Sequence, residues 1–206
     1  MPHNLANDSI IKKTKEHLYD CKSRHGQHAG CPGGVTLFLP SRVIQVGTHA
    51  KPKICVDNIS RQAEYVALSY CWGGDQIVKL EARHILDGKP WHLRQDLLPQ
   101  TFSDAIITTP NLGIEYLWID GLCIVQDDEE DKAKEINSMW SIYKNATLKF
   151  LAAGSDSVTK GFLQPRLLPY AAWLPFLQPD GTFEAMGIVD KHWDWHDHDE
   201  PLAKRM

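Results

Sequence analysis

An alternation of apolar and helical segments between residues 64 and 154 constrains the fold most. "EYVALSY", "YLWIDGLCIV" and "TLKFLAAG" are short apolar segments typical of buried strands. The segment "LPQTFSDAIITT" between the first two places Phe102, Ala105 and Ile106 on one helical face, and Pro110 is expected to end that helix. This β-α-β-α-β order predicts parallel strands joined by right-handed crossovers, with helices on the faces of the sheet.

The second helical segment, "QDDEEDKAKEINSMWSIYKNA", begins with five consecutive acidic residues, 127–131. Negative charge at this end complements the helix dipole. Farther along, apolar residues follow the i, i+3, i+4, i+7 spacing of an amphipathic helix: Ile136, Met139, Trp140 and Tyr143. We expect this stripe to face the sheet.

The chain of 206 residues is long enough for one domain with its own core. We expect an N-terminal arm with short strands and a Cys/His cluster (1–60), an α/β core (61–166), and an irregular C-terminal extension (167–206). The fold class is α/β, a three-layer sandwich with a mainly parallel sheet and irregular extensions at both ends.

Charge and hydropathy exclude several classes of protein. The net charge is −4 and the basic residues are scattered, which argues against a nucleic-acid partner. No apolar segment has the length of a membrane helix, and the N-terminal residues lack the apolar core of a signal peptide. Five cysteines without such a signal indicate reduced thiols, and we expect a cytoplasmic protein.

Open parallel sheets bind ligands beyond the carboxyl ends of their strands. The residues that follow the expected strands are therefore candidate ligand-binding residues: Ser69, Tyr70, Trp72, Gly73, Gly74, Asp120, Cys123 and Gln126. Trp72 is suited to stack on a planar ring, and the two glycines allow backbone N–H groups to approach a phosphate. The alternative is that Trp72 fills the core and that the glycines serve a tight turn.

Glu135 is the candidate catalytic residue. It is adjacent to the apolar stripe of the second helix, so its carboxylate could lean toward the strand ends. A carboxylate there could stabilise positive charge on a sugar, as glycoside cleavage requires. The alternatives are an ion pair with Lys132 and a solvated helix face.

Other patterns are weaker, and we assign no metal site. Four potential zinc ligands occur within eleven residues, but their spacing matches no standard finger: Cys21, His25, His28 and Cys31. His192 and His196 lack the glutamate of the HExxH motif. A cysteine nucleophile, Cys71 or Cys123 with His84 or His92, has no defining neighbours. The chain contains no Walker loop, GxSxG motif or GxGxxG motif.

The blocks "YVALSYCWGG", "LPQTFSDAI", "LGIEYLWIDGLCIVQDDEEDKAKEINSMWSIYKNA" and "AAG" with "GFLQPR" resemble, in this order, the fungal heterokaryon incompatibility (HET) domain. The resemblance implies a cytosolic allorecognition protein that induces programmed cell death, with a fold distantly similar to the flavodoxin-like TIR domain. Because some TIR domains cleave NAD, it also implies NAD as a candidate substrate, with no required cofactor. By position Glu135 corresponds to the catalytic glutamate of TIR enzymes.

The resemblance also implies self-association on activation, which leaves open a second hypothesis, a non-enzymatic signalling module. The final segment, "EPLAKRM", resembles the start of a later HET block whose tryptophan and glutamate are absent. This is the pattern expected of a truncated or degenerate family member.

Overall fold

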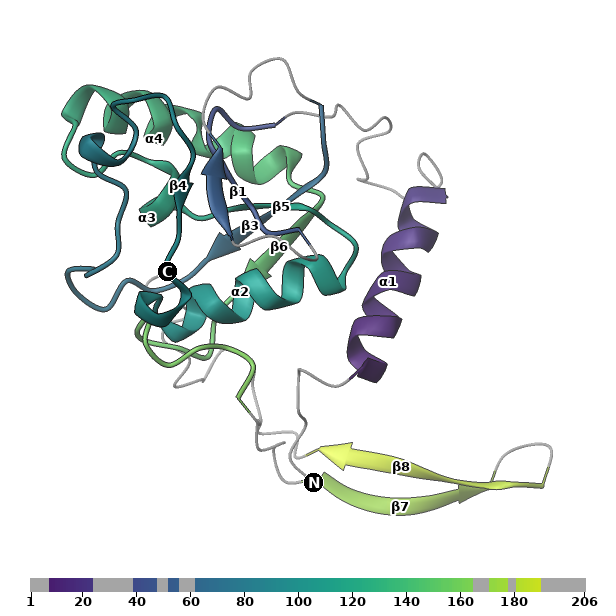
Figure 1. Ribbon diagram of the computed structural model, residues 1–206. Coiled ribbons are helices and arrows are strands. Elements are labelled where there is room, and N and C mark those ends of the chain that lie inside the picture. Colours follow the sequence, from purple (N-terminus) through teal and green to yellow (C-terminus); the bar gives the residue numbers. More distant parts are fainter. Residues whose placement is uncertain are drawn as a thin grey trace.

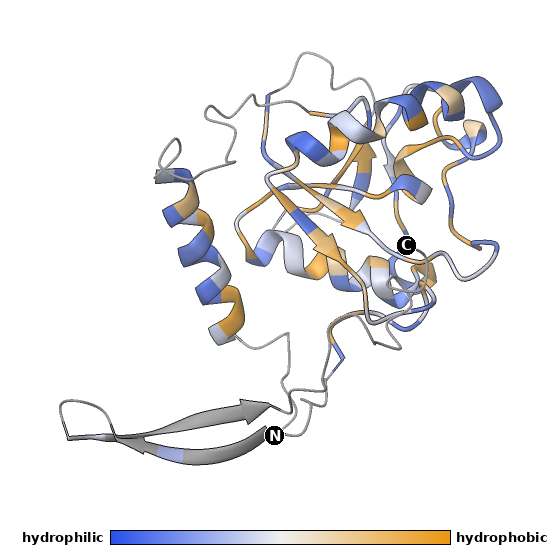
Figure 2. Cartoon of the chain, turned by 180° about the vertical axis from the view of Figure 1, so that it is seen from behind, coloured by the Kyte–Doolittle hydropathy of each residue, from blue (hydrophilic) through white to orange (hydrophobic). Residues whose placement is uncertain are grey.

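A six-stranded mixed sheet lies at the centre of the computed structural model, which describes residues 8–23, 39–47, 52–55, 62–164, 171–177 and 181–189 (Figure 1). Its strand order is β4-β2-β1-β5-β3-β6. The strands are β1 Val43–Gln45, β2 Lys53–Cys55, β3 Tyr65–Ser69, β4 Trp91–His92, β5 Tyr116–Trp118 and β6 Leu148–Leu151. The apolar residues concentrate on these strands and on the inner faces of the helices (Figure 2).

The expected β-α-β-α-β core is confirmed in strands β3, β5 and β6. Strand β3 lies between the other two and is parallel to both, with Val66 opposite Leu117 on one side and Leu148 on the other. All four residues from Tyr65 to Leu68 are fully buried, which explains the continuous apolar run in the sequence.

The expectation of a mainly parallel sheet is wrong. Strands β1, β2 and β4 extend the sheet beyond β5 through three antiparallel pairings, so only two of the five pairings are parallel. Only seven residues separate β1 from β2, and a connection this short suits antiparallel neighbours, whereas a parallel pair needs a longer crossover.

Helices cover both faces of the sheet. Helix α2 (Gln100–Asn111) and helix α4 (Glu129–Asn145) lie on opposite sides of it (Figure 1). The apolar face of α2 is buried as expected, with Phe102 and Ala105 fully inaccessible, and the helix ends one residue after Pro110.

Helix α4 buries only half of the expected apolar stripe: Met139 and Tyr143 pack against the core, whereas Ile136 and Trp140 do not. Ile136 and Trp140 are 56% and 70% exposed, whereas Glu135 and Ile142 are buried. Asp128 caps the helix, because its Oδ1 accepts hydrogen bonds from the backbone N–H groups of Glu130 and Asp131. The buried face of α4 therefore includes Glu135, a carboxylate at a position that normally holds an apolar residue. Hydropathy alone does not predict a charged residue there.

The second apolar segment is only partly a strand. Strand β5 ends at Trp118, and residues Asp120–Cys123 form the short helix α3. Asp120 begins this helical turn, with its own Oδ1 accepting from the N–H of Gly121. Three candidate residues that were expected just after a strand therefore lie elsewhere: Asp120 and Cys123 are in helix α3, and Gln126 follows it.

The ends of the chain contain regular elements. Helix α1 (Asp8–Ser23) lies within the segment expected to be an N-terminal arm with short strands. Strands β7 (Ala171–Leu177) and β8 (Phe183–Val189) form an antiparallel hairpin, so the expectation of an irregular segment from residue 167 is wrong for these residues. Among the described residues, no helix is both long and apolar enough to cross a membrane.

Candidate functional site

Trp72 lies three residues after the end of strand β3 and is held by a half-buried carboxylate. Its indole Nε1 donates a hydrogen bond to Oδ2 of Asp120 at 3.0 Å. The ring of Tyr70 lies nearly parallel to the indole, with 6.3 Å between centroids and 11° between planes. Tyr70 also meets Phe102 edge-on. We call Tyr70, Trp72 and Asp120 the Trp72 cluster; it brings the ends of β3 and β5 together.

The electrostatics of this cluster are unusual. Burial raises the pKa of Asp120 above its ordinary value, and the neighbouring Tyr70 and Trp72 side chains oppose the shift only in part. Burial and the adjacent Asp120 carboxylate also raise the pKa of Tyr70. The described residues supply no cation as a salt-bridge partner of Asp120. A half-buried carboxylate without a cation is unfavourable when charged, and groups with shifted pKa values are common at functional sites.

The glycine loop packs against a distant segment. Gly73 has a φ of 73°, and a Cβ there would lie 2.8 Å from the Cα of Ser157. Gly74 has a φ of 139°, but no atom lies within 4 Å of its Cβ position. The structure thus gives Gly73 a packing role, in line with the tight-turn alternative, and leaves Gly74 facing open space.

Glu135 belongs to a second cluster. Its Oε1 accepts a hydrogen bond from Ser41 Oγ at 2.6 Å and lies 3.4 Å from Nη2 of Arg42. The same Nη2 donates to both carboxylate oxygens of Asp131, at 2.8 and 2.6 Å. Only 9% of the Arg42 side chain and 5% of the Glu135 side chain are exposed. We call Ser41, Arg42, Asp131 and Glu135 the Arg42 cluster.

Helix α3 joins the two clusters. Asp120 at its start contacts Trp72, and the carbonyl oxygen of Cys123 at its end accepts a hydrogen bond from Arg42 Nε at 2.5 Å. Among the described residues, the side chain of Glu135 contacts Ser41 and Arg42 and makes no hydrogen bond to Trp72. The candidate residues expected to form one site therefore lie in two clusters joined by α3, with Asp120 in one and Asp131 and Glu135 in the other.

Comparison with models of protein families identifies the family of this chain. The family described as "Heterokaryon incompatibility protein (HET)" matches residues 65–206, which is more than half of the chain. The chain belongs to the HET family. Comparison with curated proteins and with solved structures found no significant match. Membership assigns the chain to heterokaryon incompatibility, and the matched segment includes both carboxylates of the site, Asp120 and Glu135.

The remaining candidate ligand residues of the HET domain differ in accessibility. Ser69 is half-buried at the end of β3, and Gln126 donates to the carbonyl oxygens of Ile124 and Asp120. Cys123 is completely buried, so its thiol cannot reach a ligand in this conformation. Burial also raises its pKa to about 12, which disfavours the thiolate that a cysteine nucleophile requires.

The metal patterns lie mostly outside the described residues. Cys21 is exposed on α1, whereas His25, His28 and Cys31 fall outside the described ranges, as do His192 and His196. Among the residues that are described, no group of three or more His, Cys, Asp or Glu side chains could hold a metal ion.

Sequence reasoning missed Ser41 and Arg42, and it assigned Asp131 to the helix dipole alone. In the structure Asp131 accepts from the N–H of Val125 as well as from Arg42, and Lys132 pairs with Glu129 instead of Glu135. The available signal was an arginine within the otherwise apolar segment "LPSRVIQV", because a charged residue there needs a buried partner.

Asp120→Asn is expected to stabilise the domain increasingly as the pH rises. The raised pKa means that the folded state binds the proton of Asp120 more tightly than the unfolded state. The wild-type chain therefore loses stability as the pH rises from the ordinary value of 3.8 through the folded pKa, and asparagine has no such dependence. Thermal denaturation of both proteins across the acidic to neutral range measures the difference.

Asp156→Asn is the matched control for this series. Asp156 is solvent-exposed, and its hydrogen bond and ion pair with Lys160 lower its pKa. This substitution should therefore lower stability slightly at neutral pH, the opposite direction. A destabilisation by Asp120→Asn that is equal at all pH values would contradict the half-buried, uncompensated charge.

Proposed function

We propose that this HET domain induces programmed cell death when incompatible strains fuse, and that it does so by hydrolysing the N-glycosidic bond of NAD. One observation carries the chemical part of the proposal. The indole Nε1 of Trp72 and Oδ2 of the half-buried Asp120 lie 3.0 Å apart, beyond the carboxyl ends of neighbouring parallel strands. This is where open α/β sheets bind nucleotides.

Each residue has a defined task in this proposal. Trp72 stacks on a planar ring of the dinucleotide, Gly74 lets the phosphates approach the backbone, and Ser69 and Asp120 hydrogen-bond to ribose hydroxyl groups. Cleavage of the bond at C1′ releases neutral nicotinamide with the bonding electron pair. Water then adds to C1′ and loses a proton. Glu135 stabilises the positive charge that develops on the ribose ring.

The Arg42 cluster imposes a condition on this chemistry. Ser41 and Arg42 occupy Oε1 of Glu135, and the side chain is only 5% exposed. A substrate therefore reaches Glu135 only after the segment that carries Ser41 and Arg42 has moved. Self-association on activation is one way to supply that movement.

The test is nicotinamide release from NAD by the purified chain at high concentration. Glu135→Gln is expected to reduce the rate by about 10²-fold or more, in the range found for loss of one electrostatic stabiliser of a transition state. Glutamine keeps an acceptor for Ser41, so folding is preserved. Glu130→Gln, on the exposed face of the same helix, should leave the rate unchanged. Equal rates in wild type and Glu135→Gln would refute this role.

A non-enzymatic, self-associating module is the second candidate. The observation that favours it is the exposed pair Ile136 and Trp140 on α4, with Lys144 lying 4.6 Å from the Trp140 ring centroid. Trp140→Glu should then abolish cell death and oligomers in the fungal host. An assembled wild-type protein that consumes no NAD would favour this module; NAD consumption lost in Glu135→Gln would favour the enzyme.

A further inference from the structure

A pocket of about 200 Å³ lies in the segment between β3 and α2, and its lining includes neither Asp120 nor Glu135. The lining residues come from the stretch 77–97: Ile77, Val78, Lys79, Glu81, Arg83, His84, Trp91, His92, Arg94 and Leu97. Drug-sized ligands occupy pockets of roughly 300–1,000 Å³. A cavity of this size suits a smaller molecule, of the dimensions of a sugar phosphate.

The lining is positively charged. Three permanent cations, Lys79, Arg83 and Arg94, face one carboxylate, Glu81. All three cations are ion-paired: Arg83 with Glu81, which lines the pocket, and Lys79 and Arg94 with Asp75 and Asp96, which do not. The side chains of Asp75 and Asp96 are 85% and 62% exposed.

These surface pairs are easily exchanged. An exposed ion pair contributes about 0–1 kcal/mol, so a bound dianion can replace the two aspartates at little cost. Arginine guanidinium groups bind phosphate in a bidentate manner, and a lysine adds a point charge. Two arginines and one lysine around one small cavity therefore match a phosphoryl group better than a neutral ligand.

One wall of the pocket is rigid and aromatic. The rings of His84 and Trp91 stack at 3.8 Å between centroids with 2° between planes. Nδ1 of His84 accepts a hydrogen bond from the N–H of Glu81, which leaves Nε2 as a donor in the neutral imidazole. Burial and the neighbouring Arg83 lower the pKa of His84, so this neutral form dominates at pH 7.

The same wall is tied to the loops around α3. Leu80 donates its N–H to the carbonyl oxygen of Gly121 and accepts from the N–H of Gln126, at 2.9 and 2.8 Å. The N–H of Ala82 donates to Oδ1 of Asp127. These bonds fix the backbone of residues 80–82, between Lys79 and Arg83, without a ligand.

From the cavity, its charge and its fixed aromatic wall, we propose that residues 77–97 form a binding site for a small organic phosphate, with Arg83, Arg94 and Lys79 as the phosphoryl-binding residues. This site is separate from the proposed NAD chemistry, and it involves neither Asp120 nor Glu135.

Isothermal titration calorimetry of the full chain with ribose 5-phosphate in a phosphate-free buffer tests the proposal. Wild type should bind this probe, and Arg83→Gln and Arg94→Gln should each weaken binding about tenfold, as expected for loss of one hydrogen bond to a charged group. Both arginines are more than 70% exposed, so neither substitution should unfold the chain.

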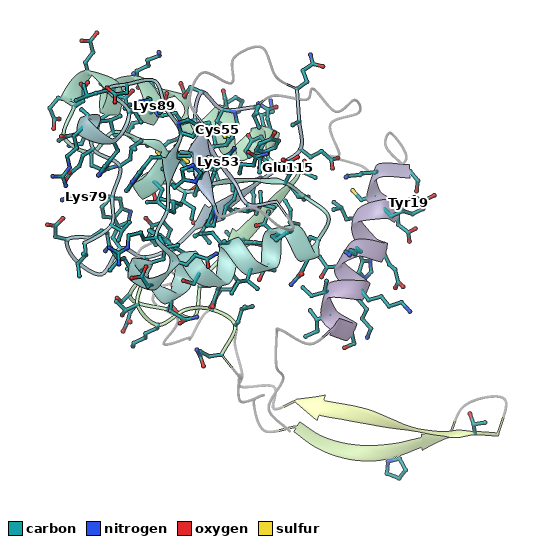
Figure 3. All side chains as sticks on the ribbon, in the orientation of Figure 1. Tyr19, Lys53, Cys55, Lys79, Lys89 and Glu115 are labelled. Atoms are coloured by element: carbon teal, nitrogen blue, oxygen red, sulfur yellow. The ribbon has the colours of Figure 1, made fainter. Side chains whose placement is uncertain are left out.

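Matched ligands and a matched variant give the experiment its specificity. Ribose and malate, which lack the phosphoryl group, should bind far more weakly than ribose 5-phosphate. Lys89→Gln removes a nearby positive charge whose side chain is 82% exposed and outside the pocket, and it should leave the affinity unchanged (Figure 3). The proposal is overturned by an absence of binding at millimolar ribose 5-phosphate, by equal binding of malate, or by equal loss in Lys89→Gln.

Discussion

Replacing Arg42 with methionine is expected to lower the free energy of unfolding by about 3–5 kcal/mol, the usual cost of removing one partner from a buried ion pair. Arg42 is the only cation within ion-pair distance of Asp131 and Glu135 among the described residues. Without it, two carboxylates remain buried side by side. The carbonyl oxygen of Cys123 also loses its hydrogen bond from the guanidinium. Urea denaturation followed by tryptophan fluorescence measures the change.

Two variants make this test specific to the buried charges. Arg94→Met removes an exposed pair with Asp96 and should change stability by no more than about 1 kcal/mol. Adding Asp131→Asn and Glu135→Gln to Arg42→Met neutralises both stranded carboxylates and should restore much of the loss. A loss below about 1 kcal/mol for Arg42→Met alone would show that the cluster is solvated, contrary to its burial.

Replacing Gly73 with alanine is expected to lower the free energy of unfolding by about 2–4 kcal/mol, since a left-handed conformation alone costs a residue with a Cβ about 1–2 kcal/mol. The added Cβ would also lie 2.8 Å from the Cα of Ser157. A backbone atom cannot rotate away, so one of the two segments must shift. Because Trp72 is the preceding residue, its fluorescence should change together with stability.

Gly88→Ala separates strain from steric contact. Gly88 has a φ of 63°, close to that of Gly73, but no atom lies within 4 Å of its Cβ position. Gly88→Ala should therefore lower the free energy of unfolding only by the cost of the left-handed conformation, about 1–2 kcal/mol. If both variants lose the same amount, the glycine loop is not packed against residue 157 and Gly73 is needed for its conformation alone.

The core strands and helices could be predicted because their sequences carry strong local signals. The run from Tyr65 to Leu68 is apolar at every position since both of its faces are covered, and Phe102 and Ala105 repeat at helical spacing. The hydropathy pattern was less accurate about which side of a helix is buried and about where a strand ends. It predicts that Trp140 faces the sheet, but Trp140 is exposed. It also predicts that Cys123 follows a strand, but Cys123 lies in the helical turn α3.

The family and the β-α-β-α-β core could be identified from the amino-acid sequence, because short-range hydropathy and a fixed order of motifs carry that information. The contacts of Glu135 could be identified only from the folded chain. Its partners, Ser41 and Arg42, lie 94 and 93 residues away, and no local pattern encodes a pairing over that distance. The antiparallel addition of β1, β2 and β4 to the sheet could likewise be seen only in the structure, because β1 pairs with β5, about 70 residues farther along the chain.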